Sequence, residues 1–487
     1  MAEKSLSAEG LQHLKSLIRF DTTNPPGNEM PAALYLQDVL KKEGFAPEVI
    51  ESAPGRGNVV ARLAGDGSEK PLLLFSHLDV VPAQAGKWEV DPFAAEEKDG
   101  CLYGRGTLDM KQMTAMSLMS IIRLKRKQAK LKRDVIFAAV ADEEAGGQKG
   151  AGYLVENRPE LLEAQYALCE MGGFRMEIKG QVFFPVQVAE RGCAWCRARF
   201  EGEPGHGSIP NPDSAVSKLG RALVRLEKKG LRFQLTEPVK DFVDIVSAQQ
   251  KAHVRTAMRA LLNPHTGSLA LKLLPKEQAR LFYAQLHSTA VPTVLKAGEK
   301  ENVIPSEAEV GIDGRVLPGQ TWEDFKGDLQ KALGKEAVIE LVRWMEPLVY
   351  PTDTELFDVI QRVILEREQD AVVVPYLLTA FTDAKHLDKL GIITYGFSPM
   401  KNDLQEKISG MIHGHNERIG LDAFAWGVDV LAEVVEKFCA TPSSKKAVDA
   451  LMDEMIGLPG SPEGTPENGA ADRPASGPPE SDEQENS

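Results

Sequence analysis

A histidine and an aspartate stand two positions apart at the end of a short apolar run in this chain. The run covers residues 72–76 (LLLFS), and His77 and Asp79 follow it. Residues two apart on an extended segment point to the same side, so the carboxylate can orient the imidazole. A carboxylate in that position fixes the tautomer of the histidine and raises its basicity as a metal ligand. The pair therefore indicates a metal ligand at the end of a buried strand.

Other carboxylates and histidines follow apolar or glycine-punctuated segments farther along the chain. An apolar run over residues 135–141 leads into three acidic residues, and a glycine-containing loop near residue 413 precedes a final helical pattern. A single acidic pair of this kind is usually a solvated surface feature. Repeated occurrence at successive strand ends is far less easily accidental. The candidates are Asp109, Glu143, Glu144, Glu170, His413 and His415.

The first part of the chain, from about residue 8 to 185, alternates between helical and strand-like segments. Continuous apolar strands between helices predict an α/β fold with a mainly parallel sheet covered by helices on both faces. Ligand sites in such folds lie beyond the carboxyl ends of the strands, which is where the candidate residues fall. The expected helices are residues 8–19, 30–43 and 111–126, and the expected strands are residues 58–63, 72–75 and 135–141.

The pattern changes near residue 186 and resumes after about residue 350. Strand and helix patterns over residues 187–344 follow a β-α-β-α-β order, which predicts a smaller α+β domain inserted in the first. A largely helical section over residues 239–291 is longer than a connection needs, so it either elaborates the inserted domain or covers another part. The predicted domains are a discontinuous catalytic domain (1–186 and 348–440), the inserted domain (187–347) and a C-terminal extension (441–487).

The composition is that of a soluble globular protein with two or three domains. The chain has 487 residues, of which 43% are hydrophobic and 26% are charged, and its net charge is −14. This acidity argues against a nucleic-acid partner, because phosphate binding needs clustered lysine and arginine. The basic run over residues 123–133 is better explained as the solvated end of a helix. Residues 459–487 hold no large apolar side chain, so we expect them to be disordered.

The N-terminal residues and the cysteines indicate the compartment. The first residues lack an apolar signal core and no stretch reaches the length of a membrane span, so we expect a cytoplasmic protein with no membrane partner. Five cysteines, an odd number, fit reduced thiols in that compartment. Cys193 and Cys196 have CxxC spacing, but no helix start accompanies their strand-like segment, which disfavours a redox or zinc site.

The candidate residues form a mixed nitrogen and oxygen ligand set that suits zinc, cobalt or manganese. Two metal ions need one ligand that reaches both, which a carboxylate does and a histidine does not. The assignment that we favour places Asp109 as the bridge, with one ion on His77 and Glu170 and the other on Glu144 and His413.

Glu143 stays free of metal in this assignment. An unliganded carboxylate beside two metal ions and a water molecule is the expected general base. Metal ions lower the pKa of water from 15.7 toward about 7, so Glu143 can accept its proton and later pass that proton to a leaving amine. The implied reaction is the hydrolysis of an amide.

Several motifs together resemble the M20 family of metallopeptidases and amidohydrolases, over roughly residues 10–440. The resemblance implies a zinc-exopeptidase-like α/β/α catalytic domain that holds two zinc ions, with cobalt or manganese as alternatives. It also implies an inserted ferredoxin-like lid domain, through which many members of the family dimerise. The motifs are SHLDVVP (76–82), W…DPF (88–93), GRG…DMK (104–111), DEE…GG (142–147) and HGHNE (413–417).

The resemblance also implies roles for individual residues. In the last motif His413, rather than His415, matches the position of a metal ligand. The residues that match the metal ligands are His77, Asp109, Glu144, Glu170 and His413, with Glu143 as the base and Asp79 as the carboxylate that orients His77.

Three residues of the inserted domain acquire roles mainly through the resemblance. His206 matches a histidine that stabilises the oxyanion, often from the partner subunit, while Asn302 and Arg315 match residues that hold the substrate's carbonyl and carboxylate. By residue type alone, His206 is a turn histidine and Arg315 belongs to an ordinary surface pair.

The helical section over residues 239–291 resembles the enlarged lid of the carboxypeptidase S branch. This leaves open the geometry of a dimer and the subunit that supplies His206. The apolar residues of the section form either an extra core or a contact for a hydrophobic acyl or side chain.

The predicted function is a two-metal hydrolase that cleaves the amide bond of a small carboxylate-bearing substrate, either a dipeptide or an N-acyl amino acid. One alternative is a catalytically silent relative that serves as a binding or scaffold protein. A second alternative keeps the site but runs the reaction in the synthetic direction or on esters.

Overall fold

The computed structural model describes residues 5–401 and 408–441. Residues 1–440 form one compact unit, and the predicted extension after residue 441 lies outside the described residues. Within the described ranges, no helix combines the length and the apolar character that crossing a membrane requires. All five cysteines are buried and free, and burial raises the pKa of Cys196 to about 12, so the CxxC thiols belong to the core.

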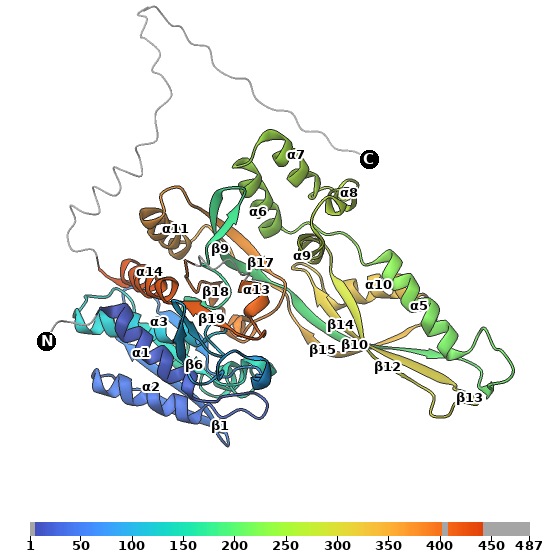
Figure 1. Cartoon of the computed structure of the whole chain (residues 1–487), viewed down its shortest axis with the longest axis horizontal. Helices are drawn as coiled ribbons and strands as arrows, with labels where there is room; N and C mark the ends of the chain where they lie inside the picture. The colour runs from blue at the N-terminus through green and yellow to red at the C-terminus, as the bar shows by residue number, and fades with distance from the viewer. Residues whose placement is uncertain (1–4, 402–407, 442–487) are drawn as a thin grey trace, which may run out of the picture. The chain divides into compact units, whose positions relative to one another are not determined.

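A ten-stranded sheet forms the larger part of the unit (Figure 1). Its central strands β6 (Val135–Val140), β3 (Leu72–His77), β7 (Tyr166–Cys169) and β18 (Ile393–Gly396) run parallel. Every residue of β3 and β6 is buried, as expected for strands that are covered on both faces. The other strands are β1 (Glu48–Ala53), β2 (Arg56–Leu63), β8 (Met176–Ile178), β9 (Gln181–Glu190), β16 (Leu348–Val349) and β17 (Val372–Leu378).

Helices pack around this sheet, which confirms the predicted α/β class. The sheet is mixed and not mainly parallel as predicted, because several outer strands pair antiparallel, as β1 does with β2 and β2 with β6. α3 (Lys111–Arg126) lies on β3 and β6 and contacts α1 (Leu6–Arg19) and α14 (Leu421–Cys439). The apolar face predicted for the last helix is buried at Phe424, Val428, Leu431 and Val435. The further helices around the sheet are α2 (Met30–Lys42), α4 (Ala151–Asn157), α11 (Glu355–Arg367) and α12 (Ala384–Leu387).

A separate four-stranded antiparallel sheet forms the inserted lid domain, in the order β12 (Thr289–Ala297), β14 (Glu307–Val316), β10 (Gly192–Glu201) and β15 (Val338–Met345). α5 (Ala215–Lys229) and α10 (Trp322–Leu333) pack on each other and share a core with the sheet. The chain order β10-α5-β12-β14-α10-β15 is ferredoxin-like, as predicted. β12 was not predicted, because it is an edge strand whose side chains are mostly exposed and show no alternation of burial.

The strand predicted over residues 187–200 is two strands in different sheets. β9 continues to Glu190 in the large sheet, and β10 begins at Gly192 in the lid sheet. The predicted domain boundary at residue 187 therefore falls inside β9, three residues before that strand ends.

The extra helical section consists of α6 (Glu237–Ala248), α7 (Ala252–Ala260), α8 (Gly267–Lys272) and α9 (Lys276–Leu286). α6 packs on β9 and β17 of the large sheet, where Phe242, Val243 and Val246 form an apolar cluster with Phe183 and Val374. The sequence left open whether this section elaborates the inserted domain or covers another part of the protein. α6 covers the large sheet.

Candidate metal centre

His77 is the last residue of β3, and its ring is held by its own loop. Its Nδ1 lies 2.9 Å from the backbone oxygen of Asp79, and a carbonyl only accepts, so Nδ1 carries the hydrogen. The other ring nitrogen, Nε2, lies 3.0 Å from Asp109 and 3.8 Å from Glu170. This arrangement presents Nε2 as the nitrogen for a metal ion.

Asp109 stands between the two predicted histidine ligands. Its Oδ1 faces His77 Nε2 at 3.0 Å, and its Oδ2 faces His413 Nε2 at 3.1 Å. The same nitrogen of His413 lies 3.2 Å from Glu144, although the His413 side chain is 52% exposed, and His415 belongs to neither group of candidate ligands among the described residues. Each oxygen of Asp109 therefore faces a different histidine, which is the geometry required of a bridging carboxylate.

Two groups of candidate ligands meet in this place among the described residues. The ligating atoms of His77, Asp109 and Glu144 lie within 4.8 Å of one another, and so do those of His77, Glu143 and Glu170. Glu144 Oε1 is buried and has no hydrogen-bond partner within the described ranges. An orphaned carboxylate oxygen among imidazoles and further carboxylates fits a divalent cation. Glu143, predicted to bind no metal, also lies within reach of the second group.

The pKa values of the cluster are shifted because several acidic side chains are buried close to one another. Burial and the neighbouring Glu170 raise the pKa of Glu143 well above its usual value, and burial raises that of Glu144 to about 7. Hydrogen bonds with Asp109 and Glu144 raise the pKa of His413 to about 10. Protons thus occupy the cluster without metal, and a bound dication would displace them.

Asp79 holds more than the histidine that it was predicted to orient. Its Oδ1 accepts a hydrogen bond from the backbone N–H of Glu143 at 3.0 Å, and its Oδ2 accepts one from Glu144 at 3.1 Å. The carboxylate also accepts from Asn24 at 2.8 Å, and it lies 3.6 Å from His77 Nδ1. Asp79 therefore fixes the turn that carries Glu143 and Glu144, while its backbone oxygen fixes His77.

A buried ion pair, not predicted from the sequence, joins the two loops that supply Asp109 and His413. Arg105 donates to Glu417 at 2.6 Å and to the backbone oxygen of Gly414 at 2.9 Å. Glu417 also accepts from the backbone N–H groups of Leu108, at 2.7 Å, and Asp109. Alongside, β19 (Arg418–Gly420) pairs with β5 (Cys101–Tyr103). Both residues lie within the recognised motifs, but no spacing rule links positions 312 apart.

Comparisons with known proteins agree with this centre. Residues 73–437 match peptidase family M20/M25/M40. The chain belongs to this family. This chain is 29% identical over 444 residues to the N-fatty-acyl-amino acid synthase/hydrolase PM20D1 of Xenopus tropicalis, and the match covers 88% of this chain and 85% of that protein. It is 28% identical over 443 residues to human aminoacylase-1, covering 88% and 95%.

A solved structure shares the fold of this M20 chain. The M20 family metallo-carboxypeptidase Sso-CP2 from Sulfolobus solfataricus superposes with a TM-score of 0.64 and 18% identity, covering 88% of this chain and 99% of that one. The chain is therefore an enzyme of the M20 peptidase and amidohydrolase family with a candidate metal site of histidine, aspartate and glutamate.

His206 and Asn302 lie next to each other but outside the two groups of candidate metal ligands. His206 lies on β11 (Gly205–His206), which pairs with β13 (Val303–Ile304), and its Nδ1 is 2.7 Å from Ser208 Oγ. The backbone oxygen of Asn302 accepts a hydrogen bond from Gly207. Both side chains belong to exposed residues, and the metal-capable groups of the described chain include neither.

Arg315 differs from these two residues because it reaches the catalytic part of the M20 chain. It pairs with Asp313 at 2.8 Å, and its guanidinium lies 4.8 Å from the ring of Phe381. Lys385 lies 4.3 Å from the same ring, and its buried Nζ lacks a hydrogen-bond partner among the residues described. Lys385 was not predicted as a site residue. A lone lysine in an irregular segment carries no signal of its own.

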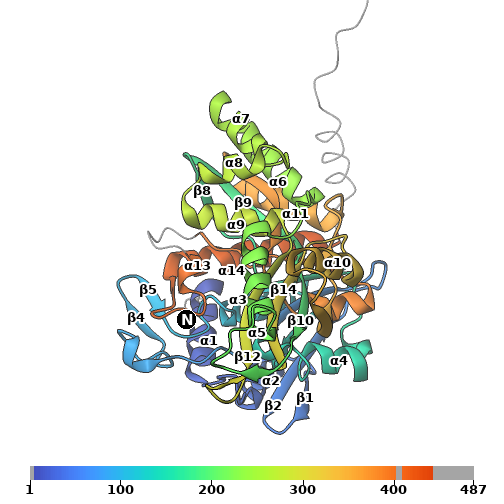
Figure 2. The same cartoon turned by 90° about the vertical axis from the view of Figure 1, so that its right-hand side faces the viewer.

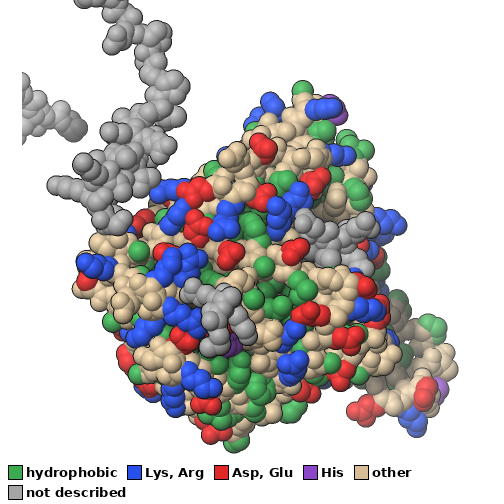
Figure 3. Space-filling model, turned by 60° about the vertical axis from the view of Figure 1, so that its left-hand side comes forward, with side chains coloured by type: hydrophobic (Ala, Val, Ile, Leu, Met, Phe, Trp, Pro, Cys, Tyr) green, Lys and Arg blue, Asp and Glu red, His purple; other side chains and the backbone are tan. Residues whose placement is uncertain are grey.

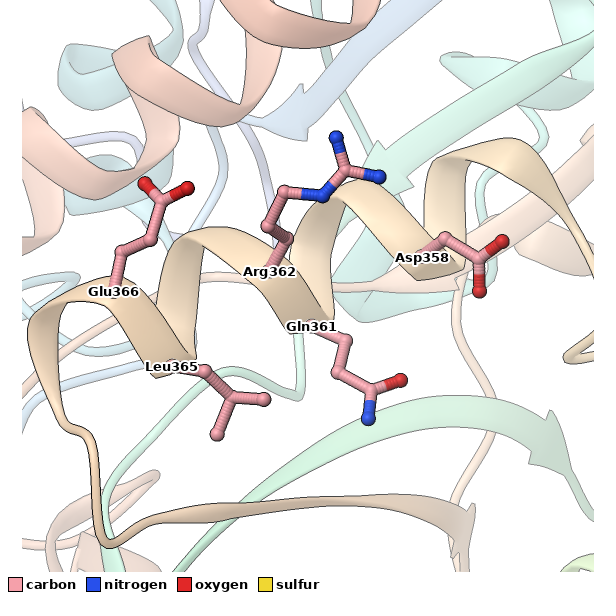
Figure 4. A pocket seen from close by; sticks show the side chains of 5 residues that line it. All are labelled: Asp358, Gln361, Arg362, Leu365 and Glu366. Carbon is pink, nitrogen blue, oxygen red and sulfur yellow. The ribbon is translucent and has the colours of Figure 1, made fainter. Parts of the chain in front are cut away.

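A hollow beside α11 lies apart from the M20 metal centre. Its lining residues come from successive turns of that one helix (Figure 4), and none of them is a predicted site residue. They are Asp358, Gln361, Arg362, Leu365 and Glu366.

Proposed function

We propose that this chain is a two-metal hydrolase that cleaves the amide bond of an N-acyl amino acid or a dipeptide. The observation that carries the proposal is Asp109, whose two oxygens face His77 and His413. One ion would be held by His77, Glu170 and Asp109, and the other by Asp109, Glu144 and His413, with zinc as the expected metal. Bound divalent ions supply carbonyl polarisation and a lowered pKa of water.

Glu143 is the proposed general base. The turn that carries it is fixed by Asp79, and burial raises the pKa of its carboxyl group. A base with a raised pKa can accept a proton from the attacking water and return it to the leaving nitrogen. A silent scaffold is disfavoured, because Glu143 and all five proposed ligands are present.

The substrate's carboxylate is proposed to bind beside Phe381. Arg315 and Lys385 lie against the same ring, and the ammonium of Lys385 has no hydrogen-bond partner in the described part of the chain. The charge of this ammonium is balanced by the nearby carboxylates of Glu143, Glu170, Glu190 and Asp383, but its N–H groups, unpaired among the described residues, can still donate to a substrate carboxylate. The names of the relatives, an aminoacylase and an N-fatty-acyl-amino acid synthase/hydrolase, support an N-acyl amino acid first.

A homodimer through the lid domain is part of the proposal. β12 is an edge strand with Val291, Val294 and Leu295 exposed, and an open edge can pair with a second copy. A dimer would allow His206 to reach the metal centre of the partner. Sedimentation of the full chain tests this part, and a monomer with full activity would contradict it.

The central test is a panel of N-acyl amino acids, dipeptides, the matching esters and the matching carboxamides, assayed with added zinc, cobalt or manganese. We expect hydrolysis of the carboxylate-bearing amides, and condensation under excess product would show the synthetic direction named for the Xenopus relative. Equal turnover of the carboxamides would overturn the carboxylate site. Lys385→Met should lower kcat/KM more for the carboxylates than for the carboxamides, since Lys385 also lowers the pKa of the base Glu143 in both reactions.

Asp109→Asn tests the bridge itself. We expect the variant to lose both ions on dialysis, because the amide nitrogen cannot ligate and only one oxygen remains. Asp99→Asn is the matched control, since Asp99 is exposed and belongs to neither group of candidate ligands among the described residues. Retention of both ions by Asp109→Asn, measured by metal analysis, would contradict the assignment.

A further inference from the structure

The helices α8 and α9 expose three leucines among basic side chains. Leu269, Leu273 and Leu281 have exposed fractions of 63%, 76% and 53%. Single exposed leucines are ordinary on protein surfaces, but several of them beside mainly basic side chains are not. The α8–α9 patch consists of Leu269, Lys272, Leu273, Lys276, Glu277, Arg280 and Leu281, all of them exposed, and its three basic residues and one acidic residue give it a net charge of +2.

The backbone places the first two leucines side by side. α8 covers Gly267–Lys272, and Leu273, which caps it, keeps helical dihedral angles of −86° and −11°. Residues four apart on a helix lie one above the other, so Leu269 and Leu273 form one apolar knob. α8 meanwhile buries Ala270 on its other side and packs on α9. The knob therefore adds nothing to the core of this section.

The charge of this region is opposite to that of the whole protein. Residues 251–280 contain six lysines and arginines and one acidic residue, Glu277, in a chain whose net charge is −14. Arg259 pairs with Asp244 of α6 at 3.3 Å, and Arg255 donates to backbone oxygens at the end of α6. These two arginines hold the helices together, while Lys272, Lys276 and Arg280 are exposed near the leucines in the sequence.

The helical section that carries the α8–α9 patch is packed on the large sheet. The cluster of α6 with β9 and β17 anchors the section to the large sheet, and α7 and α8 form its outer end (Figure 2). Figure 3 shows basic and apolar side chains, with an acidic one among them, at the upper end of the molecule, at the height of α7 in Figure 1. A preformed patch of this kind can adsorb on a partner without refolding.

We propose that the α8–α9 patch adsorbs this protein on an anionic lipid surface. Exposed leucines enter the boundary between headgroups and acyl chains, and flanking lysines and arginines bind the anionic headgroups. The acidic remainder of the protein is repelled by the same surface, so only this face is presented to it. The contact is peripheral and needs no membrane-spanning segment. This inference is independent of the proposed substrate.

Co-sedimentation of the full chain with lipid vesicles tests the inference. We expect binding to vesicles that contain phosphatidylserine, much weaker binding to phosphatidylcholine alone, and weakening with added salt. Each basic residue near such a surface is worth about a fivefold change in partitioning, so Lys272→Glu with Lys276→Glu should reduce binding by more than about 25-fold. Leu269→Ser with Leu273→Ser should reduce binding by at least about tenfold.

The matched control is Lys41→Glu with Lys42→Glu, which makes the same charge change at two exposed lysines of α2. We expect this control to bind far more strongly than the patch variant, and all variants to keep the circular dichroism spectrum of the wild type. No binding by the wild type, or equal binding by the two lysine variants, would overturn the proposal. The proposal would also be overturned, in favour of a second copy of the chain, if Leu269→Ser with Leu273→Ser changed the oligomeric state without vesicles. Binding of the protein to an acidic peptide but not to lipid would overturn it in favour of a protein partner.

Discussion

The metal centre and the lid loops differ in how their functional side chains are held. His77, Asp109 and Glu170 are at least nine-tenths buried and come from strand ends or from loops tied by buried hydrogen bonds. His206 and Asn302 are exposed and lie beside a two-residue strand pair. Four of the five proposed ligands are thus held as buried side chains, whereas His413, whose side chain is 52% exposed, is held by Asp109 and Glu144, and the lid residues lie on an exposed loop.

The largest expected effect belongs to Glu143. Glu143→Gln keeps the shape of the side chain but cannot accept a proton, so we expect kcat to fall by about 10²- to 10⁴-fold. Both metal ions should remain bound, because Glu143 is not a proposed ligand. Stopped assays together with metal analysis measure this. A variant that loses a metal ion would instead place Glu143 among the ligands, as its proximity to His77 and Glu170 allows.

The buried pair of Arg105 and Glu417 tests how firmly the centre is preorganised. Glu417→Gln leaves the guanidinium of Arg105 without its counter-charge, and breaking a buried pair costs about 3–5 kcal/mol of unfolding free energy. Urea denaturation measures the loss. The control is Glu160→Gln, whose exposed pair with Arg158 should matter little. Equal stability of Glu417→Gln and wild type would show that the loops are held by other contacts.

His206→Ala should act on the chemical step and leave the centre intact. We expect kcat to fall by about 10²- to 10³-fold, the cost of removing one oxyanion donor, while metal content stays that of the wild type. Mixing this variant with Glu143→Gln should restore part of the activity, because a mixed dimer has one complete site if His206 acts across subunits. Failure of the mixture, with a dimer present, would place His206 in its own subunit's site.

The smallest expected effect concerns Glu190, near the passage from the large sheet to the lid. Burial raises its folded pKa to about 8, above its usual value of 4.5. The folded state therefore retains the proton, and stability falls as pH rises from 4.5 toward 8. Glu190→Gln, which stays neutral, should nearly match the wild type at pH 4.5 and exceed it at pH 6 by about 2 kcal/mol. Parallel stability curves in both proteins would contradict the raised pKa.

The sequence predicted the parts of the fold that have a local signal. Continuous apolar runs predicted β3 and β6, and the spacing of Phe424, Val428 and Leu431 predicted the face of α14. β12 escaped because an exposed edge strand has no alternation of burial. One predicted strand is two strands, β9 and β10, joined at Arg191. Their sequence pattern is continuous, and only the structure shows that they belong to different sheets.

By itself, the sequence determined the chemistry of the candidate site, because residue types and their positions after apolar runs are local properties. It placed His77, Glu144 and Glu170 at successive strand ends. Only the tertiary structure decided which groups meet: Glu417 with Arg105, Asp79 with the turn of Glu143, and Lys385 with the ring that Arg315 also contacts. These contacts join residues far apart in the chain. Periodicity and spacing are local properties, so they do not predict contacts that form only when the chain folds.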